Sequence, residues 1–141
     1  MKKTLDIPKY LIEHGVKPSY QRIRILDYFS KYKSHPTVNE IYDSVISEIP
    51  TLSKTTVYNT LNLFVKNKII QEILIEENEV RYDWATSEHG HFKCEVCEIL
   101  FDIPFSIDLE NYPSLKNSII NERHVYFKGI CNLCISKSNK F

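Results

Sequence analysis

The segment from His89 to Cys97 reads His-Gly-His-Phe-Lys-Cys-Glu-Val-Cys, and it decides how the rest of the chain is interpreted. Its histidines are two positions apart, so on a β-strand both imidazoles would point to the same face of the sheet. Cys94 and Cys97 form a Cys-x-x-Cys motif, whose tight turn lets two thiolates bind one ion. Thiolates favour zinc, whereas imidazole mixed with carboxylate suits iron, manganese or zinc. The segment therefore predicts two different metal sites.

Two further cysteines complete the thiolate site. Cys131 and Cys134 repeat the Cys-x-x-Cys motif near the C-terminus. Two such motifs supply a tetrahedral four-cysteine zinc site, which is closed to solvent and therefore structural. The alternative is two disulfide bonds in a secreted protein, but the chain shows no apolar signal segment at its N-terminus. We therefore expect structural Zn²⁺ bound by Cys94, Cys97, Cys131 and Cys134, in a cytoplasmic protein.

Length and charge suggest two halves with different roles. A chain of 141 residues makes one ordinary domain or two small ones, and it contains no apolar run long enough to span a membrane. Its net charge is zero, yet residues 1–70 contain 11 Lys and Arg against 6 Asp and Glu, and residues 71–141 contain 7 against 12. The opposite charge balances suggest different roles for the two halves, and we expect two domains, over residues 1–84 and residues 85–141.

The first half reads as helices joined by short connections. A short amphipathic helix is expected over residues 7–13, and Ser19, Thr37 and Ser53 are expected N-caps of three longer helices with apolar residues at helical spacing. Thr37 opens a capping box. Pro50 is expected to end the helix that begins after Thr37. A helix, a short turn and a second capped helix form the pattern of a helix-turn-helix.

The helix after Ser53 has a polar outer face. Its amides and hydroxyls suit base edges, and lysines there or in the preceding helical region suit phosphates. The alternative is an ordinary solvated helix face. The expected DNA-binding residues are Lys17, Arg22, Lys54, Thr55, Tyr58, Asn59 and Asn62.

Strands dominate the rest of the chain. Apolar and polar residues alternate along residues 71–75 and 80–84, which flank an acidic tip. This pattern predicts a β-hairpin, the wing of a winged helix. Strands are also expected over residues 91–94, 99–103 and 125–130. We expect residues 106–122 to be helical, although Pro113 must start, kink or interrupt that helix, and residues 136–141 to be a frayed tail.

Four residues outside the cysteine motifs can join His89 and His91 at a second metal site: His35, Asp83, Asp102 and His124. Each has an ordinary alternative, because an Asp at a strand end is usually solvated and a His before Pro usually lies on the surface. Spacing alone does not bring them together.

The chain resembles the ferric uptake regulator (Fur) superfamily. The resemblance is carried, in order, by Gln21-Arg22, His35-Pro36-Thr37, Thr55-Thr56-Val57-Tyr58, the His89–Cys97 segment and Gly129-x-Cys131-x-x-Cys134. It implies a dimeric, metal-dependent bacterial repressor that binds a double-stranded DNA operator. It also implies an α+β fold, with an N-terminal winged helix-turn-helix domain followed by a small α/β dimerisation domain with a four-cysteine zinc site.

Within that family the residues are most similar to the peroxide-sensing PerR branch. That resemblance implies a regulatory site for Fe²⁺ or Mn²⁺ made by His35, Asp83, His89, His91 and Asp102, and oxidation of His35 or His89 by hydrogen peroxide when iron is bound. Iron-sensing relatives more often have glutamate at the two aspartate positions. Two positions depart from the pattern: Asn59 stands where many relatives have Arg, and His124 lacks its usual partners, so a further site with Glu88 or Glu110 stays open.

The sequence is compatible with three other functions. One is iron- or zinc-responsive uptake repression without peroxide sensing. Another is an enzyme that uses a His/Asp metal site to activate water, although the sequence shows no general base with a substrate pocket. The third is a constitutive zinc-containing DNA-binding protein. We expect a non-enzymatic homodimer, with no membrane partner and no small-molecule substrate other than peroxide.

Overall fold

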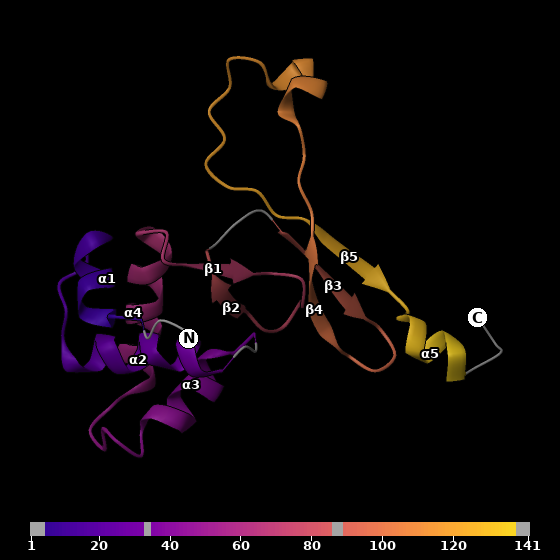
Figure 1. The fold of residues 1–141 in the computed structure, drawn as a ribbon. Helices are drawn as coiled ribbons and strands as arrows, with labels where there is room; N and C mark the ends of the chain where they lie inside the picture. The colour runs from indigo at the N-terminus through magenta and orange to yellow at the C-terminus, as the bar shows by residue number, and fades with distance from the viewer. Residues whose placement is uncertain (1–4, 33–34, 86–88, 138–141) are drawn as a thin grey trace. The chain divides into compact units, whose positions relative to one another are not determined.

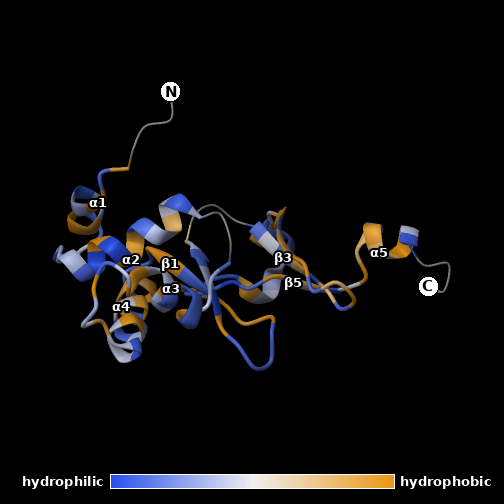
Figure 2. Ribbon diagram, turned by 90° about the horizontal axis from the view of Figure 1, so that it is seen from below, coloured by the Kyte–Doolittle hydropathy of each residue, from blue (hydrophilic) through white to orange (hydrophobic). Residues whose placement is uncertain are grey.

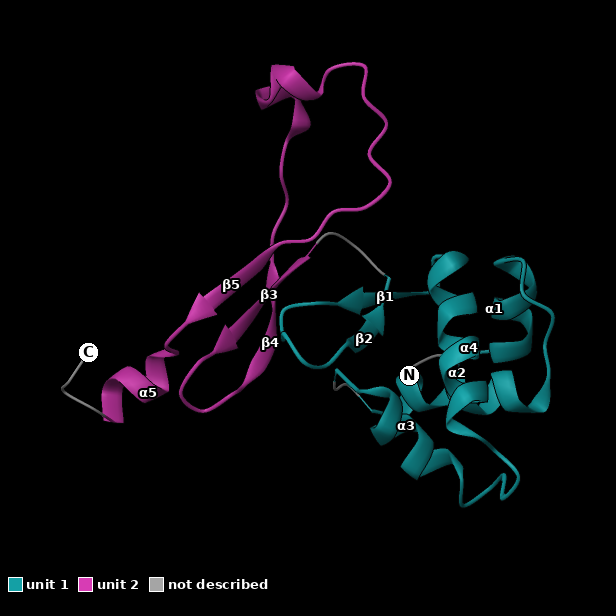
Figure 3. Cartoon of the chain, turned by 180° about the vertical axis from the view of Figure 1, so that it is seen from behind, with its two compact units in different colours: residues 1–86 teal, residues 87–141 magenta. Residues whose placement is uncertain are grey.

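A computed structural model describes residues 5–32, 35–85 and 89–137. The chain divides into two compact units, residues 1–86 and 87–141 (Figure 3). Within the described ranges, no helix is both long and apolar enough to cross a membrane.

The first unit contains four helices, whose order is clear in Figure 1: α1 (Ile7–Glu13), α2 (Tyr20–Lys31), α3 (Val38–Val45) and α4 (Lys54–Lys66). The three predicted N-caps are confirmed. The side-chain oxygen of each accepts a hydrogen bond from the backbone N–H three residues on, at 3.2 Å for Ser19 and Thr37 and at 3.0 Å for Ser53. Helix α3 ends at Val45 and not at Pro50, because the carbonyl of Val45 accepts hydrogen bonds from the N–H groups of both Glu48 and Ile49 in a turn.

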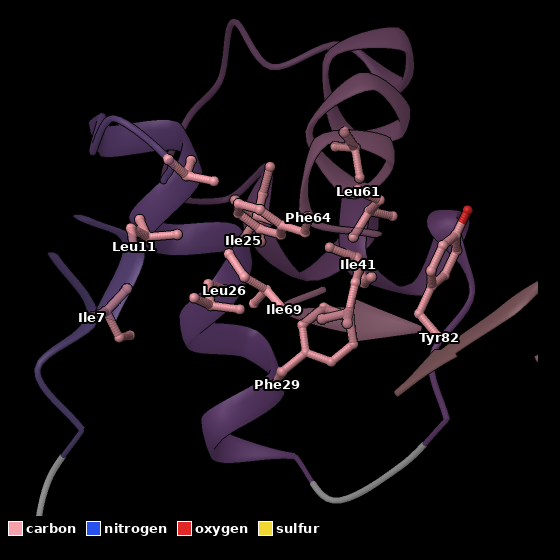
Figure 4. Close-up of a cluster of buried hydrophobic side chains, with 14 of the residues drawn as sticks. Ile7, Leu11, Ile25, Leu26, Phe29, Ile41, Leu61, Phe64, Ile69 and Tyr82 are labelled. Atoms are coloured by element: carbon pink, nitrogen blue, oxygen red, sulfur yellow. The ribbon is translucent and has the colours of Figure 1, made fainter. Parts of the chain in front are cut away.

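These helices surround one apolar core. Hydrophobic and hydrophilic residues alternate along their ribbons (Figure 2), and the hydrophobic ones turn inward (Figure 4). Ile25, Leu26, Ile41, Leu61 and Phe64 are wholly buried. Burial of this kind contributes about 1.5–3 kcal/mol for each large apolar side chain, so the core is the main source of stability in this unit.

The predicted hairpin is present. Strands β1 (Ile70–Ile73) and β2 (Arg81–Trp84) pair antiparallel, with Ile70 opposite Trp84. The hairpin is tied to the helices through Trp84, whose indole Nε1–H donates to the carbonyl of Phe29 at 3.1 Å. Together with α2, α3 and α4 it makes the winged helix-turn-helix arrangement.

The second unit is built on a three-stranded sheet in the order β4-β3-β5, from β3 (His89–Cys94), β4 (Leu100–Pro104) and β5 (Tyr126–Gly129). Strand β3 pairs antiparallel with β4 and parallel with β5. A short helix, α5 (Asn132–Lys137), follows. The buried cluster of this unit consists of Cys94, Cys131 and Cys134, with Phe92 and Ile130 packed against it.

Two predictions for this unit are wrong. Residues 106–122 do not form an α-helix; they hold only two 3-10 turns, Leu109–Asn111 and Pro113–Leu115, in a long loop that leaves the sheet and returns to it (Figure 1). Pro113 lacks an N–H and disfavours helical geometry in the residue before it, and Asn117 adopts a positive φ of 65°. The tail prediction is wrong for Ser136 and Lys137, which are helical in α5, while residues 138–141 lie outside the described part of the chain.

Candidate metal centres and DNA-binding surface

The four cysteines of the second unit come together in one cluster. All four sulfur atoms lie within 4.8 Å of one another, with Sγ to Sγ distances of 3.8 Å for Cys94–Cys134 and 3.7 Å for Cys97–Cys131. A disulfide would need about 2.05 Å, so these cysteines are thiols and not disulfide-bonded. A tetrahedron with Zn–S bonds of about 2.3 Å has edges of about 3.8 Å. The cluster therefore fits a single Zn²⁺ ion.

The backbone prepares Cys94 to be a thiolate ligand. Its Sγ accepts N–H groups from Val96, Cys97 and Cys131, each at 3.4 Å. Burial opposes ionisation, but these donors outweigh it and lower the pKa of the Cys94 thiol to about 6. Burial and hydrogen bonds to the neighbouring sulfurs instead raise the pKa of Cys134 to about 12. Full ionisation of the cluster therefore needs a bound cation.

A second set of candidate ligands lies on the same sheet. His91 and Asp102 are direct partners across the antiparallel pair β3–β4, and His91 Nε2 lies 3.2 Å from Asp102 Oδ1. His89 points to the same face, with its ring centroid 4.7 Å from that of His91 and its Nε2 3.9 Å from Asp102 Oδ1. The imidazoles are nearly buried, whereas the carboxylate is half exposed. The pairing of β3 with β4 thus brings two imidazoles and one carboxylate close together on one face of the sheet.

The first unit holds an imidazole–carboxylate pair of its own. His35 precedes α3 and Asp83 lies on β2, and His35 Nε2 is 3.6 Å from Asp83 Oδ2. Asp83 Oδ1 accepts the backbone N–H of Trp84 at 2.8 Å, which orients the carboxylate. Both side chains are mostly shielded from solvent. Residues 48 positions apart in the chain therefore form one set of candidate ligands.

Among the described residues, His124 belongs to neither group of candidate ligands. Its Nδ1 lies 3.0 Å from the hydroxyl of Tyr126 and its Nε2 lies 3.3 Å from Glu122 Oε2. Glu88 lies outside the described residues, so the further site considered from the sequence stays an open prediction.

Helix α4 presents the polar face that the sequence predicted. Lys54, Thr55, Tyr58 and Asn59 are exposed, whereas Asn62 is half-buried. Tyr58 keeps 52% of its surface accessible even though it is a large aromatic residue. Val57, Leu61 and Phe64 on the opposite face are fully buried. Four of the five residues of α4 that the sequence predicted to contact DNA therefore face solvent, and Asn62 does so in part.

A hollow of about 460 Å³ adjoins this face. Lys17, Arg22 and Gln21, at or just before the start of α2, line one side, and Thr56 and Asn59 of α4 line the other. Arg22 Nη1 donates to the carbonyl of Lys17 at 2.8 Å, so the two expected phosphate-binding residues are held together. The chain thereby places cations beside amide and hydroxyl groups on one surface of the first unit.

Sequence reasoning missed Arg81 as a residue of the His35–Asp83 region. Its Nη1 donates to the carbonyl of His35 at 2.9 Å, and its Nε binds Glu76 Oε1 at 2.7 Å. The signal in the sequence is slight, namely a single basic residue two positions after the acidic hairpin tip.

The model of the ferric uptake regulator family matches residues 13–126 of the chain. The peroxide operon regulator of Bacillus subtilis (strain 168) is 29% identical over 143 residues, covering 99% of this chain and 96% of that protein. The peroxide-responsive repressor PerR of Staphylococcus epidermidis is 29% identical over 129 residues, covering 89% of this chain and 85% of that protein.

Solved structures show the same fold. The Helicobacter pylori ferric uptake regulator Fur, reported to have three functional metal-binding sites, aligns with a TM-score of 0.70 at 20% identity, over 96% of this chain and 97% of its own. The peroxide sensor PerR from Streptococcus pyogenes aligns with a TM-score of 0.52 at 24% identity, over 94% of this chain and 96% of its own. These likenesses confirm the predicted α+β fold class.

Proposed function

Because the chain belongs to the ferric uptake regulator family, we propose that it is a metal-dependent DNA-binding repressor that senses hydrogen peroxide through oxidation of its own ligand histidines. Members of this family are transcriptional regulators rather than enzymes, and they bind DNA and dimerise. The observation that carries the peroxide assignment is the ligand chemistry. Imidazoles and aspartates gather separately from the thiolates, at His35–Asp83 and at His89, His91 and Asp102.

The two kinds of ligand support two kinds of metal. The four-cysteine cluster would hold structural Zn²⁺, whose binding contributes directly to folding. The histidines and aspartates would hold regulatory Fe²⁺ or Mn²⁺. We propose that one ion takes ligands from both sets, so that its binding favours one arrangement of the two units over others. Because binding requires neutral imidazoles and ionised carboxylates, occupancy should fall as the pH is lowered.

Peroxide sensing follows from which groups would stand nearest the regulatory ion. Bound Fe²⁺ would supply the electron that activates hydrogen peroxide. The imidazoles of His35 and His89 would then be among the nearest oxidisable groups, because the thiolates would be engaged on zinc. In the net change one peroxide oxygen is added at a ring C–H of the imidazole and the other leaves as water. An oxidised ring is a poorer ligand, so metal and DNA would both be released.

The DNA partner would be a double-stranded operator read by a homodimer. Lys17, Arg22 and Lys54 would contact phosphates, and Thr55, Tyr58, Asn59 and Asn62 would face the major groove. The second unit exposes several large apolar side chains, among them Phe101, Phe127 and Leu133, which suits a dimer interface. We place the protein in the cytoplasm, where thiols stay reduced.

The test compares metals on one DNA duplex. Duplexes are first selected from a random pool with Mn²⁺-loaded protein, and binding is then measured by fluorescence anisotropy with Fe²⁺, Mn²⁺ or Zn²⁺ in the regulatory site. Brief peroxide treatment should release DNA from the iron form alone. Iron-loaded protein that keeps its DNA after peroxide would point to iron- or zinc-responsive repression. DNA binding that is indifferent to the labile metal would point to constitutive binding.

Asp102→Glu provides a matched variant for this test. It keeps the charge but lengthens the side chain, and it therefore shifts the carboxylate away from its position opposite His91. We expect it to suppress the peroxide response while metal-dependent DNA binding largely persists.

A further inference from the structure

Residues 35–37 belong to neither a helix nor a strand, so their position must be fixed by other contacts. Two hydrogen bonds from β2 do this. Tyr82 N–H donates to the carbonyl of Pro36 at 2.9 Å, and Arg81 Nη1 donates to the carbonyl of His35 at 2.9 Å. Pro36 is itself fully buried. His35 and Pro36 are therefore held against β2 through their carbonyl groups.

Arg81 is in turn held by two carboxylates. Its Nε binds Glu76 Oε1 at 2.7 Å, at the hairpin turn, and its Nη1 lies 3.5 Å from Glu40 Oε1, in the first turn of α3. The guanidinium thus joins the hairpin, α3 and the His35 segment. Planar guanidinium groups are well suited to such multiple contacts, because their donors have a fixed geometry. The two carboxylates also compensate a positive charge that would otherwise repel a nearby cation.

Residues two positions apart on a strand share a face, so Arg81 and Asp83 lie on the same face of β2. Tyr82, between them, points into the core and is 1% exposed. Arg81 holds the backbone of His35, while Asp83 Oδ2 lies 3.6 Å from the imidazole Nε2 of the same residue. Two residues on one face of β2 therefore contact both the backbone carbonyl and the imidazole of His35.

We propose that Arg81 is a positioning residue for the regulatory metal site, because its bond to the His35 carbonyl sets the imidazole opposite Asp83. The inference rests on the proposed function in one respect, that His35 and Asp83 are metal ligands. Groups that orient metal ligands in this way typically change metal affinity by about 10- to 100-fold when they are removed.

The chain supplies a matched control for Arg81. Arg24 is also 24% exposed and also binds two carboxylates, Glu48 and Asp27, in the same unit. Its contacts are with α2 and the turn after α3, and none of the contacts described for it involves His35. Arg24→Gln should therefore reproduce the loss of two ion pairs without the loss of ligand positioning.

The experiment uses the full-length, zinc-containing protein and titrates Mn²⁺, with the free ion followed by electron paramagnetic resonance. Arg81→Gln should weaken Mn²⁺ binding by about tenfold or more. Arg81→Lys should recover part of this loss, and Arg24→Gln should leave the affinity unchanged. In the iron form after peroxide, Arg81→Gln should also lower the ratio of oxidised His35 to oxidised His89. A loss of stability alone would not change that ratio.

Unchanged Mn²⁺ affinity in Arg81→Gln would overturn the inference, as would an equal loss in Arg24→Gln. If Arg81→Gln does not fold, Glu76→Gln gives the decision, because it keeps the guanidinium and removes its closest brace. That variant should show a smaller loss of affinity, and wild-type affinity would count against the proposal. If the zinc-containing wild-type protein binds no Mn²⁺, the proposed function itself is refuted.

Discussion

The first unit buries a continuous set of aliphatic and aromatic side chains, whereas the buried hydrophobic cluster of the second consists of three cysteines with two partly buried apolar neighbours. Both have regular hydrogen-bonded secondary structure, so the difference lies in what holds that structure together. In the first unit, apolar burial offsets the entropy of folding. The second unit is a small sheet with many exposed apolar residues, and such units usually need a metal or a partner.

The largest expected effect is therefore the loss of the zinc cluster. Cys131→Ser removes one of four ligands, and structural zinc contributes about 10–16 kcal/mol in small zinc domains. We expect the variant to lose zinc, the dimer and the hydrogen-exchange protection of β3, β4 and β5. Helices α2 and α4 should keep their protection. A zinc-free Cys131→Ser protein that stays a stable dimer would refute this account of the second unit.

The next largest effect should come from the apolar core, and it should fall on the other unit. Phe64→Ala removes a fully buried ring, which costs about 3–5 kcal/mol through lost burial and the cavity that remains. Exchange protection should drop in α2 and α4, with zinc content unchanged. Ile12→Ala is the control, because Ile12 is 64% exposed and its truncation should change the unfolding free energy by about 0.5 kcal/mol or less.

A smaller effect should separate sequence reading from simple positioning on DNA. The ring of Tyr58 is exposed on α4 and can pack against a thymine methyl, so Tyr58→Ala should reduce discrimination between selected and unrelated duplexes by about 1–3 kcal/mol. Lys54→Ala should instead weaken binding to all duplexes. It should also lower the slope of the logarithm of the binding constant against the logarithm of salt concentration by about one in magnitude. Equal loss by Tyr58→Ala on every duplex would make Tyr58 a positioning residue only.

The smallest effect concerns a helix cap. Ser53 accepts the N–H of Thr56, and Ser53→Ala should destabilise α4 by about 1 kcal/mol. The fall should appear in chemical denaturation of the first unit and leave the second unit unchanged. A shift of both units together would show that they unfold as one cooperative body and that their stabilities are not independent.

Local chemistry made much of the fold predictable from sequence. Ser19, Thr37 and Ser53 cap helices because a polar side chain before an apolar helical repeat satisfies backbone donors at once. The helix expected over residues 106–122 failed for a similarly local reason, since Pro113 and the positive φ of Asn117 break the hydrogen-bond ladder. Helix α5 was missed because its few residues carry too short a pattern.

The candidate sites divide in the same way. Cys94 and Cys97 can be identified as ligands from their spacing in the sequence. The register of β3 and β4 places His91 opposite Asp102. His35 and Asp83 depend on how the hairpin packs against the segment before α3, which no sequence spacing expresses. The role of Arg81 could not be predicted from the sequence for the same reason, because it depends on one contact with a carbonyl 46 positions earlier.

The most direct test of the account is peptide mass spectrometry of iron-loaded protein after brief exposure to peroxide. The account predicts one added oxygen on His35 or His89, loss of DNA binding in proportion, and neither change in the Mn²⁺-loaded protein. Iron-loaded protein whose histidines stay unmodified and whose DNA stays bound would contradict it.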